Sequence, residues 1–258
     1  MQASKKPSQN SPTGKLRPNT LDRGGKSPLS CKPWNRPSGT VYVPRIVLRL
    51  PRRSKDTRPK RPQVRINAKQ ERMGTKVEIK GIETPGLVIR DMVASDARSF
   101  ARYMLREEYQ ATIAVRYQTA ADVQKFVARC LRRQAALTRS VFHLSAELKA
   151  SNQVIGDGFI IMNRPKTFEI GWGVHPELWG RGFGTEIGHA LMAIAFEKLG
   201  ATTVWAKSFV SNAASIRLCD RLGMTQDRVS KNHPVAPGFR TDVSFHSISA
   251  SDYFDAPY

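Results

Sequence analysis

At 258 residues, the chain is long enough for one sizeable domain with an extension, and its 42 Lys and Arg against 21 Asp and Glu give a formal net charge of +21. Its three cysteines are far apart and show no CxxC spacing, which argues against a disulfide framework or a structural zinc site and fits a reducing compartment. The longest uninterrupted apolar stretch, residues 190–196, is far shorter than the roughly 20 residues of a membrane-spanning helix, so we expect a soluble cytoplasmic protein with no membrane contact and no metal.

The first 80 residues differ in composition from the rest of the chain. They hold 21 of the Lys and Arg but only four of the Asp and Glu, a net charge of +17, together with ten of the 16 prolines. Proline fixes φ and removes an N–H donor, and the like charges repel one another. We therefore predict a basic, proline-rich, disordered extension over residues 1–80 and a folded domain over residues 85–250.

Three interpretations of this extension remain open. A basic arm can bind RNA or the ribosome, because counterion release gives it salt-dependent affinity without sequence recognition. Organelle transit peptides are also basic and poor in acidic residues, although the prolines would break their amphipathic helix. Finally, the composition turns ordinary just after Met73, so residues 1–72 can be a translated leader upstream of a natural start near Met73.

The next part of the chain predicts one strand and two helices. Residues 87–90 have the pattern of a short strand, and Ser95 or Asp96 can cap the helix that follows. Residues 119–137 predict an amphipathic helix, because their apolar side chains recur at helical spacing. The apolar residues of the two helices are, in order, Phe100, Tyr103, Met104, Val123, Phe126, Val127, Cys130 and Leu131.

The remaining elements alternate between strands and helices. Alternating apolar positions predict three antiparallel strands, with a turn at residues 163–166 between the last two. A glycine-rich turn, a helix, a strand and a second helix follow, and Gly223 ends that second helix. Two closing strands complete the domain. The predicted bounds of these elements are 141–148, 154–162 and 167–174 for the three strands, then 187–199, 202–209 and 212–222, and finally 225–229 and 241–248.

The glycine-rich turn is the most informative feature of the sequence. Three glycines stand at alternate positions between the strand ending at Val174 and the helix that begins at Ile187. Because glycine lets an anion approach the backbone, a strand, a glycine turn and a helix in this order can bind a phosphate through N–H groups. The turn has the sequence Trp179-Gly180-Arg181-Gly182-Phe183-Gly184-Thr185-Glu186.

With a second motif, the turn points to a known superfamily. The chain resembles the N-acetyltransferases of the GNAT superfamily, and most closely the branch that includes the ribosomal-protein N-terminal acetyltransferases. The resemblance covers residues 87–248, and Trp179, where many members carry Gln or Arg, is a variant familiar in that branch. The residues that carry it are 87–90 (Leu-Val-Ile-Arg), 170–174 (Ile-Gly-Trp-Gly-Val), 179–186, 212–217 (Asn-Ala-Ala-Ser-Ile-Arg), 222–224 (Leu-Gly-Met) and Asp242.

The resemblance implies an α/β fold, a mixed and mostly antiparallel sheet flanked by helices, whose central strands splay apart around the pantetheine arm of acetyl-CoA. Backbone groups around Gly173 and Val174 would bind pantetheine as an added strand would. Asn212 would contact the same arm, and Ser215 would lie near the thioester sulfur. The residues implied to cradle the pyrophosphate are Gly180, Arg181, Gly182, Phe183, Gly184 and Thr185.

The transfer chemistry requires a neutral amine. A lysine amine is neutral about one time in a thousand at cytoplasmic pH, whereas an α-amine with a pKa near 7.8 is about a quarter neutral. The sequence offers Glu169 as a base, acting directly or through water, although this residue can equally be the polar face of an alternating strand. Ser215 is the candidate acid or thiolate donor, with helix N-terminal hydrogen bonding as its simpler role. No tyrosine lies between Asn212 and Met224, where many members of the superfamily keep their acid.

Other reactive side chains have simpler explanations. We expect His175 to cap the turn, His189 to be structural or exposed, and Cys219 to be a buried helix residue without a covalent role. The three tryptophans near the predicted cleft, Trp172, Trp179 and Trp205, pack in the core by default, and one of them can shape the acceptor pocket.

The sequence therefore predicts an acetyl-CoA-dependent N-acetyltransferase that uses direct attack in a ternary complex. Its expected acceptor is a protein N-terminal α-amine, and the alternative acceptor is a small amine such as an aminoglycoside or a polyamine. A second class remains open, a non-catalytic module that binds coenzyme A or RNA. Acceptor-binding loops are expected at residues 107–119 and 230–240.

Overall fold

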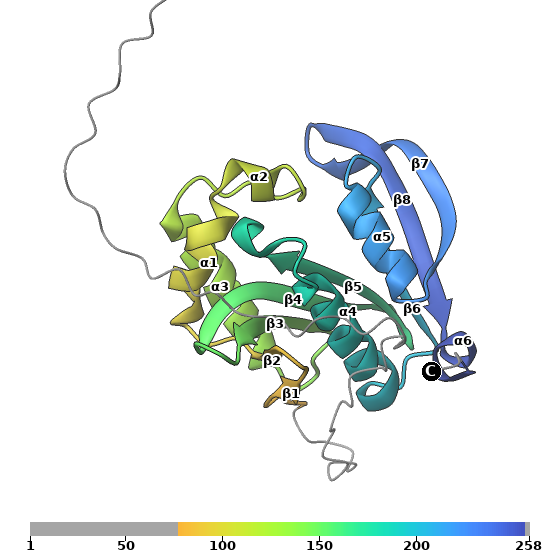
Figure 1. Ribbon diagram of the computed structural model, residues 1–258, viewed down its shortest axis with the longest axis horizontal. Helices are drawn as coiled ribbons and strands as arrows, with labels where there is room; N and C mark the ends of the chain where they lie inside the picture. The colour runs from red at the N-terminus through yellow and green to blue at the C-terminus, as the bar shows by residue number, and fades with distance from the viewer. Residues whose placement is uncertain (1–76, 256–258) are drawn as a thin grey trace, which may run out of the picture. The chain divides into compact units, whose positions relative to one another are not determined.

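The computed structural model describes residues 77–255, which form one eight-stranded sheet in the order β1-β2-β3-β4-β5-β6-β8-β7 with helices on both of its faces (Figure 1). The pair β5–β6 is parallel and the other neighbouring strands are antiparallel. The predicted fold class is confirmed. The strands are β1 (Ile82–Glu83), β2 (Leu87–Asp91), β3 (Val141–Leu148), β4 (Gln153–Arg164), β5 (Thr167–Val174), β6 (Thr203–Phe209), β7 (Thr225–Ala236) and β8 (Phe239–Ser249).

The helices follow the predicted order with a few additions. Short helices occur at α2, at the 3₁₀ turn η1 and at the C-terminal α6, and a π-helical segment, η2, continues α4. None of the helices in the described range is long and apolar enough to cross a membrane. The bounds are α1 (Asp96–Met104), α2 (Glu107–Gln110), α3 (Ala120–Gln134), η1 (Pro176–Leu178), α4 (Phe183–Ala193), η2 (Ile194–Lys198), α5 (Ala213–Arg221) and α6 (Ala250–Asp255).

The hypotheses about the N-terminal extension concern a part of the chain that lies almost wholly outside the described residues. Residues 1–76 and the proposed start near Met73 fall there, so the structure does not test them. The described residues of the predicted domain begin with an extended lead-in before β1 that contributes to the core, since Ile79 is 1% exposed.

Helix α3 shows how local sequence sets an element boundary. The Thr119 hydroxyl accepts a hydrogen bond from the Asp122 N–H at 3.2 Å, and the Asp122 carboxylate accepts one from the Thr119 N–H at 3.0 Å. This reciprocal capping box satisfies two N–H groups at the helix start. The helix ends at Gln134 rather than at Leu137 as predicted, because Leu137 is 85% exposed and has no apolar surface to cover.

The C-terminal hairpin is longer than predicted. Residues 230–240 were expected to be a loop, but β7 and β8 extend through them to a tight turn at residues 237–238. The β7–β8 register has three irregularities, between Gln226 and Arg228, between Ser230 and His233, and between Pro234 and Ala236. Asp242 also fixes the hairpin, because it accepts hydrogen bonds from Lys231 Nζ at 2.7 Å and the Asn232 N–H at 2.9 Å. The prediction of a loop at residues 230–240 is therefore wrong, while contact of this segment with the acceptor stays a prediction.

The sheet has one apolar core on each of its faces. Helix α4 packs on β4 and β5 and lies against α5, whereas α1 and α3 pack on the opposite face over β3 and β4 (Figure 1). On the α4 side, Ile187 and Leu191 are fully buried; on the other side Phe100, Tyr103 and Val123 are fully buried. The two faces at the centre of the sheet are thus covered by different helices.

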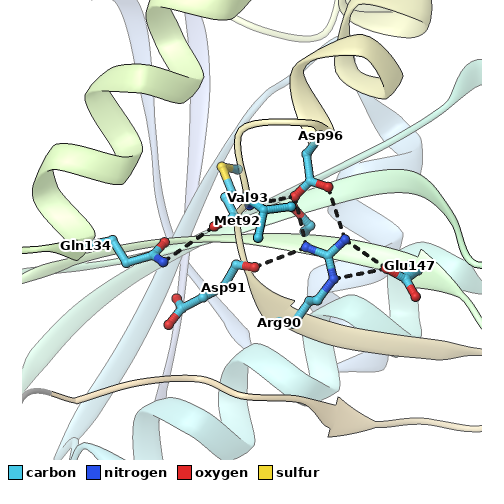
Figure 2. A network of polar contacts seen from close by, with 8 residues as sticks. Arg90, Asp91, Met92, Val93, Asp96, Gln134 and Glu147 are labelled. Atoms are coloured by element: carbon cyan, nitrogen blue, oxygen red, sulfur yellow. Dashed lines mark hydrogen bonds and ion pairs between the residues drawn. The ribbon is translucent and has the colours of Figure 1, made fainter.

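A buried ion network fixes the start of α1 to the sheet (Figure 2). Ser95 occupies the N-cap position but its side chain makes no capping hydrogen bond; Asp96 accepts one from the Val93 N–H at 3.0 Å instead. The Asp96 carboxylate also accepts two hydrogen bonds from Arg90, at 2.9 and 3.0 Å, and one from Ser145 at 2.6 Å. Although burial raises the pKa of Asp96, these hydrogen bonds outweigh it and hold the pKa below its ordinary value.

Candidate active site

The two central strands, β5 and β6, diverge after Glu169. Strands β5 and β6 pair only through residues 167–169 and 203–205, after which neither strand pairs with the other. Strand β6 continues instead beside β8 over residues 203–209, while residues 170–174 of β5 stay paired with β4 (Figure 1). We call the unpaired edges beyond Glu169 the splay.

The backbone of β5 presents alternate residues to the splay. The His175 N–H donates to the Ile155 carbonyl of β4 at 2.8 Å. Because hydrogen-bonded pairs alternate along an antiparallel ladder, Gly173 also faces β4 and Val174 faces the splay. The Val174 carbonyl accepts the Trp179 indole N–H at 2.8 Å. The Val174 N–H and, by the same alternation, the backbone of Trp172 are left to bind a strand-like ligand.

The glycine turn opens directly onto the first turn of α4. Gly180 and Gly182 have φ values of +75° and +89°, in the left-handed region that favours glycine, and a Cβ on either would meet nothing within 4 Å. Gly182 is the N-cap of α4 and has no side chain that could cap the helix. The N–H groups of Phe183 and Gly184 therefore receive no hydrogen bond from a capping side chain. The helix begins at Phe183, four residues before the predicted start, because the turn ends at Gly182.

The second motif forms the start of α5 on the other side of the splay. The Asn212 Oδ1 accepts a hydrogen bond from the Ser215 N–H at 3.1 Å, which caps the helix and leaves the Asn212 amide N–H₂ uninvolved in the cap. Helix α5 packs closely on α4, since a Cβ at Gly184 would stand 2.9 Å from the Leu218 side chain. As predicted, Gly223 ends the helix, with φ +76°.

An ion pair lies at the apex of the splay. Glu169, the last β5 residue that pairs with β6, is 7% exposed and one of its oxygens lies 3.1 Å from Lys207 Nζ on β6. Lys207 is about half exposed and also lies over the Trp205 ring at 5.7 Å. Glu169 therefore lies where the two strands diverge. Its carboxylate is paired with Lys207, so an acceptor amine or a water molecule would compete with Lys207 for it.

Comparison with known proteins identifies this arrangement. The model of the acetyltransferase (GNAT) domain matches residues 86–225, which include the glycine turn, the splay and α5. The chain belongs to the GNAT acetyltransferase family. An uncharacterised N-acetyltransferase of Bacillus subtilis, YoaA, is 24% identical over 174 residues, which cover 65% of this chain and 95% of YoaA.

Solved structures share the fold of this GNAT domain. An acetyltransferase of the GNAT family from Bacillus anthracis superposes with a TM-score of 0.58 at 20% identity over 68% of this chain and 99% of its own. A ribosomal-protein-S5-alanine acetyltransferase from Vibrio fischeri gives 0.58 at 16% identity over 67% and 98%. A chimera of the spermidine N-acetyltransferase SpeG from Vibrio cholerae gives 0.56 at 16% identity over 66% and 99%.

The family makes this protein an acyltransferase, and acetyl-CoA is the cosubstrate of the family. The structure brings the predicted residues of the GNAT domain together around the splay. Val174 and the glycine turn lie on its β5 side, Asn212 and Ser215 on its β6 side, and Glu169 at its apex. Within residues 77–255, no group of three or more His, Cys, Asp and Glu is placed to hold a metal ion.

The simpler explanations of the other side chains agree with the structure. Burial raises the pKa of the Cys219 thiol to about 12, so this cysteine stays protonated in the core. His175 caps η1 by accepting the Glu177 N–H at its Nδ1, and burial lowers its pKa. Trp205 stacks on Phe245, with ring centroids 6.1 Å apart. Trp179 is the exception: it is 46% exposed at the turn, so the prediction that it packs in the core is wrong.

Sequence reasoning missed a group of polar side chains on the α1 side of the splay. Asp157, in the middle of β4, accepts hydrogen bonds from Tyr103 on α1 and Tyr109 on α2. The one available signal was an acidic residue at the centre of an otherwise apolar strand, residues 154–162. The two tyrosines could not be assigned to it, because they lie about 50 residues away in sequence.

Proposed function

We propose that this acyltransferase transfers an acetyl group from acetyl-CoA to a primary amine, a protein N-terminal α-amine, by direct attack in a ternary complex. The observation that carries the proposal is the uncapped start of α4 behind two left-handed glycines, at the open end of the splay. Each N–H bond to a charged group contributes about 1.5–3 kcal/mol, and the helix N-terminus adds about 0.3–1 kcal/mol. Several such bonds can hold a pyrophosphate without a lysine.

Different residues of the chain would bind the parts of acetyl-CoA and stabilise the leaving thiolate. The N–H groups from Gly180 to Gly184 would bind the pyrophosphate, with Arg181 contributing from its exposed rim. The Thr185 N–H donates to the Gly182 carbonyl at 3.0 Å, so Thr185 would contribute through its hydroxyl instead. The Val174 N–H and the Asn212 amide would hold the pantetheine arm, and Ser215 would donate to the leaving thiolate. Positioning two reactants in this way removes much of the entropic barrier, because the attack becomes effectively unimolecular.

The acceptor class follows from the modest acid–base equipment of the site. An α-amine is about a quarter neutral near pH 7.3, so a single carboxylate such as Glu169, acting through water, is sufficient. The name of the Vibrio fischeri neighbour, a ribosomal-protein alanine acetyltransferase, supports a protein N-terminus, and that of the spermidine acetyltransferase supports the alternative of a small amine. A cytoplasmic location and an RNA or ribosome contact through residues 1–80 would match a ribosomal-protein acceptor.

The acceptor assignment is tested with purified full-length chain, acetyl-CoA and a panel of amines. The panel holds Ala- and Ser-initiated hexapeptides, their Nα-blocked lysine-containing counterparts, spermidine and an aminoglycoside. We expect free thiol release to be fastest with the unblocked peptides. Faster release with spermidine or the aminoglycoside would assign a small-molecule acceptor, and acetyl-CoA binding without thiol release from any amine would indicate a binding module.

The role of Glu169 is tested by Glu169→Gln. Because general base catalysis contributes about 100- to 10,000-fold, we expect kcat to fall by at least about 100-fold while the KM for acetyl-CoA changes little. Lys207→Met is the matched control, since it removes the same ion pair and leaves the carboxylate in place. If both variants lose activity and thermal stability equally, Glu169 serves the structure through its ion pair and not the proton transfer.

A further inference from the structure

Beyond Glu169, strand β5 carries no side chains on the face of the sheet where α1 and α3 pack. Side chains alternate along a strand, so Trp172 and Val174 lie on the α4 face with the core around Ile187, and residues 169, 171 and 173 lie on the opposite face. Two of those three are glycines. Only Glu169, at the apex, places a β5 side chain on that face of the splay.

Neighbouring side chains take the space that the glycines leave. A Cβ at Gly171 would overlap the ring of Phe159, which leans over β5 from β4. A Cβ at Gly173 would overlap the Tyr109 hydroxyl and stand 2.5 Å from the Asp157 Oδ1. The β5 wall of the splay on this face is therefore formed by an aromatic ring, a phenol and a carboxyl group that β5 itself does not supply.

Asp157 is the polar centre of this wall. It is 7% exposed, and its Oδ1 accepts hydrogen bonds from the Tyr103 hydroxyl at 2.7 Å and the Tyr109 hydroxyl at 3.2 Å. Burial raises the pKa of Asp157, and burial also raises the pKa values of both tyrosines well above 10, so the phenols remain donors. Within residues 77–255, the structure shows no hydrogen bond to its second oxygen, Oδ2. Such a carboxyl group has an unused acceptor beside the splay.

The opposite face of the splay is closed by helix packing. Leu191 and Ile187 of α4 cover the glycines of β4, and a Cβ at Gly188 would stand 2.7 Å from the Leu222 side chain of α5. Helices α4 and α5 thus meet over the α4 face. An acceptor that attacks a thioester lying in the splay has the Asp157 face left for its approach.

We propose that Asp157, oriented by Tyr103 and Tyr109, is the carboxylate that binds the protonated amino group of the acceptor and so selects a cationic primary amine, before Glu169 takes the proton that this group must lose in order to attack. The proposal rests on the acetyl transfer proposed above and adds the residue that recognises the acceptor. An ammonium group supplies the N–H donors that the second carboxylate oxygen lacks, and its charge favours the ionised carboxylate. Phe159 forms the apolar wall against the first side chain of the acceptor.

Asp157→Asn tests this role in the full-length chain. With the Ala-initiated hexapeptide and with spermidine as acceptors, we expect the acceptor KM to rise about 10- to 100-fold, the range of a lost hydrogen bond to a charged group. The KM for acetyl-CoA should stay within about twofold, because Asp157 lies one strand away from the backbone that would hold pantetheine. Asp252→Asn is the matched control: it makes the same change on α6, near the C-terminal end of the described residues, where the exposed Asp252 carboxylate accepts a hydrogen bond from the Ser249 hydroxyl at 2.7 Å.

Tyr109→Phe provides a second variant that keeps the carboxylate and removes one of its orienting hydrogen bonds, so it serves if Asp157→Asn does not fold. It should raise the acceptor KM by a smaller factor. An unchanged acceptor KM in folded Asp157→Asn, or in Tyr109→Phe where only that variant folds, or an equal rise in Asp252→Asn, would overturn the proposal. If the wild-type chain turns over neither amine, calorimetric titration of both into the chain with coenzyme A replaces KM. Absence of amine binding there overturns the proposal, while acetyl-CoA affinity, measured separately, reports on the cosubstrate site alone.

Discussion

Gly182→Val is expected to lower the affinity for acetyl-CoA by at least about 100-fold. The φ of Gly182 is +89°, a conformation in which a β-branched residue is strained by about 1–3 kcal/mol, so the variant would relax the turn and move the N–H groups of Phe183 and Gly184. Each displaced N–H bond to phosphate costs a further 1.5–3 kcal/mol or so. The valine side chain would also project into open space at the helix start, where the pyrophosphate is proposed to bind.

Gly200→Val separates strain from lost binding. Gly200 has a φ of +67°, a Cβ there would also meet nothing within 4 Å, and it lies in the loop between η2 and β6. Both variants should lose a similar amount of thermal stability, but only Gly182→Val should lose acetyl-CoA binding in a calorimetric titration of the full-length chain. Retained affinity in Gly182→Val would remove the glycine turn from the cosubstrate site.

The sequence predicted most elements because their side chains follow the periodicity of the structure that forms. Strands β3 and β5 have the predicted bounds, and the capping residue Thr119 fixed the start of α3. These are local signals, since a buried face must repeat every two residues in a strand and every three or four in a helix. The glycine turn was recognisable for the same reason, because φ values above zero at Gly180 and Gly182 restrict those positions to glycine.

Features that depend on distant residues were missed. The β7–β8 hairpin continues through Ser230 and Pro234 by register irregularities that leave no alternating pattern, so the segment resembled a loop. The surroundings of Asp157 are assembled from β4, α1 and α2, and the pairing of Glu169 with Lys207 joins β5 to β6. Sequence reasoning named Glu169 but not Asp157, and it could not name the partners of either residue, which decide what each carboxylate can do.

Asp96→Ala is expected to destabilise the protein by about 3–5 kcal/mol, the range measured when one partner of a buried ion pair is removed. Asp96 is 4% exposed. Its loss would leave the Arg90 guanidinium with Glu147 and the Asp91 carbonyl, and would leave the Ser145 hydroxyl and the Val93 N–H without this acceptor (Figure 2). The measurement is the free energy of unfolding from urea denaturation of the full-length chain at pH 7.

Glu147→Gln is the control on the same arginine. Glu147 accepts from Arg90 at 2.8 and 2.9 Å, but its side chain is 22% exposed against 4% for Asp96, so water can replace much of what it provides. We expect a loss of at most about 1 kcal/mol. The pH dependence of the free energy of unfolding gives a further test of the role of Asp96. A carboxylate whose folded pKa lies below its ordinary 3.8 contributes stability above that pH and loses it as the pH falls through the folded value. The gap between wild type and Asp96→Ala should therefore be constant near neutral pH and shrink in acid below pH 3.8. A gap of the same size for both variants, or one that grows in acid, would show that packing around α1 and not the Arg90–Asp96 pair holds this corner of the sheet.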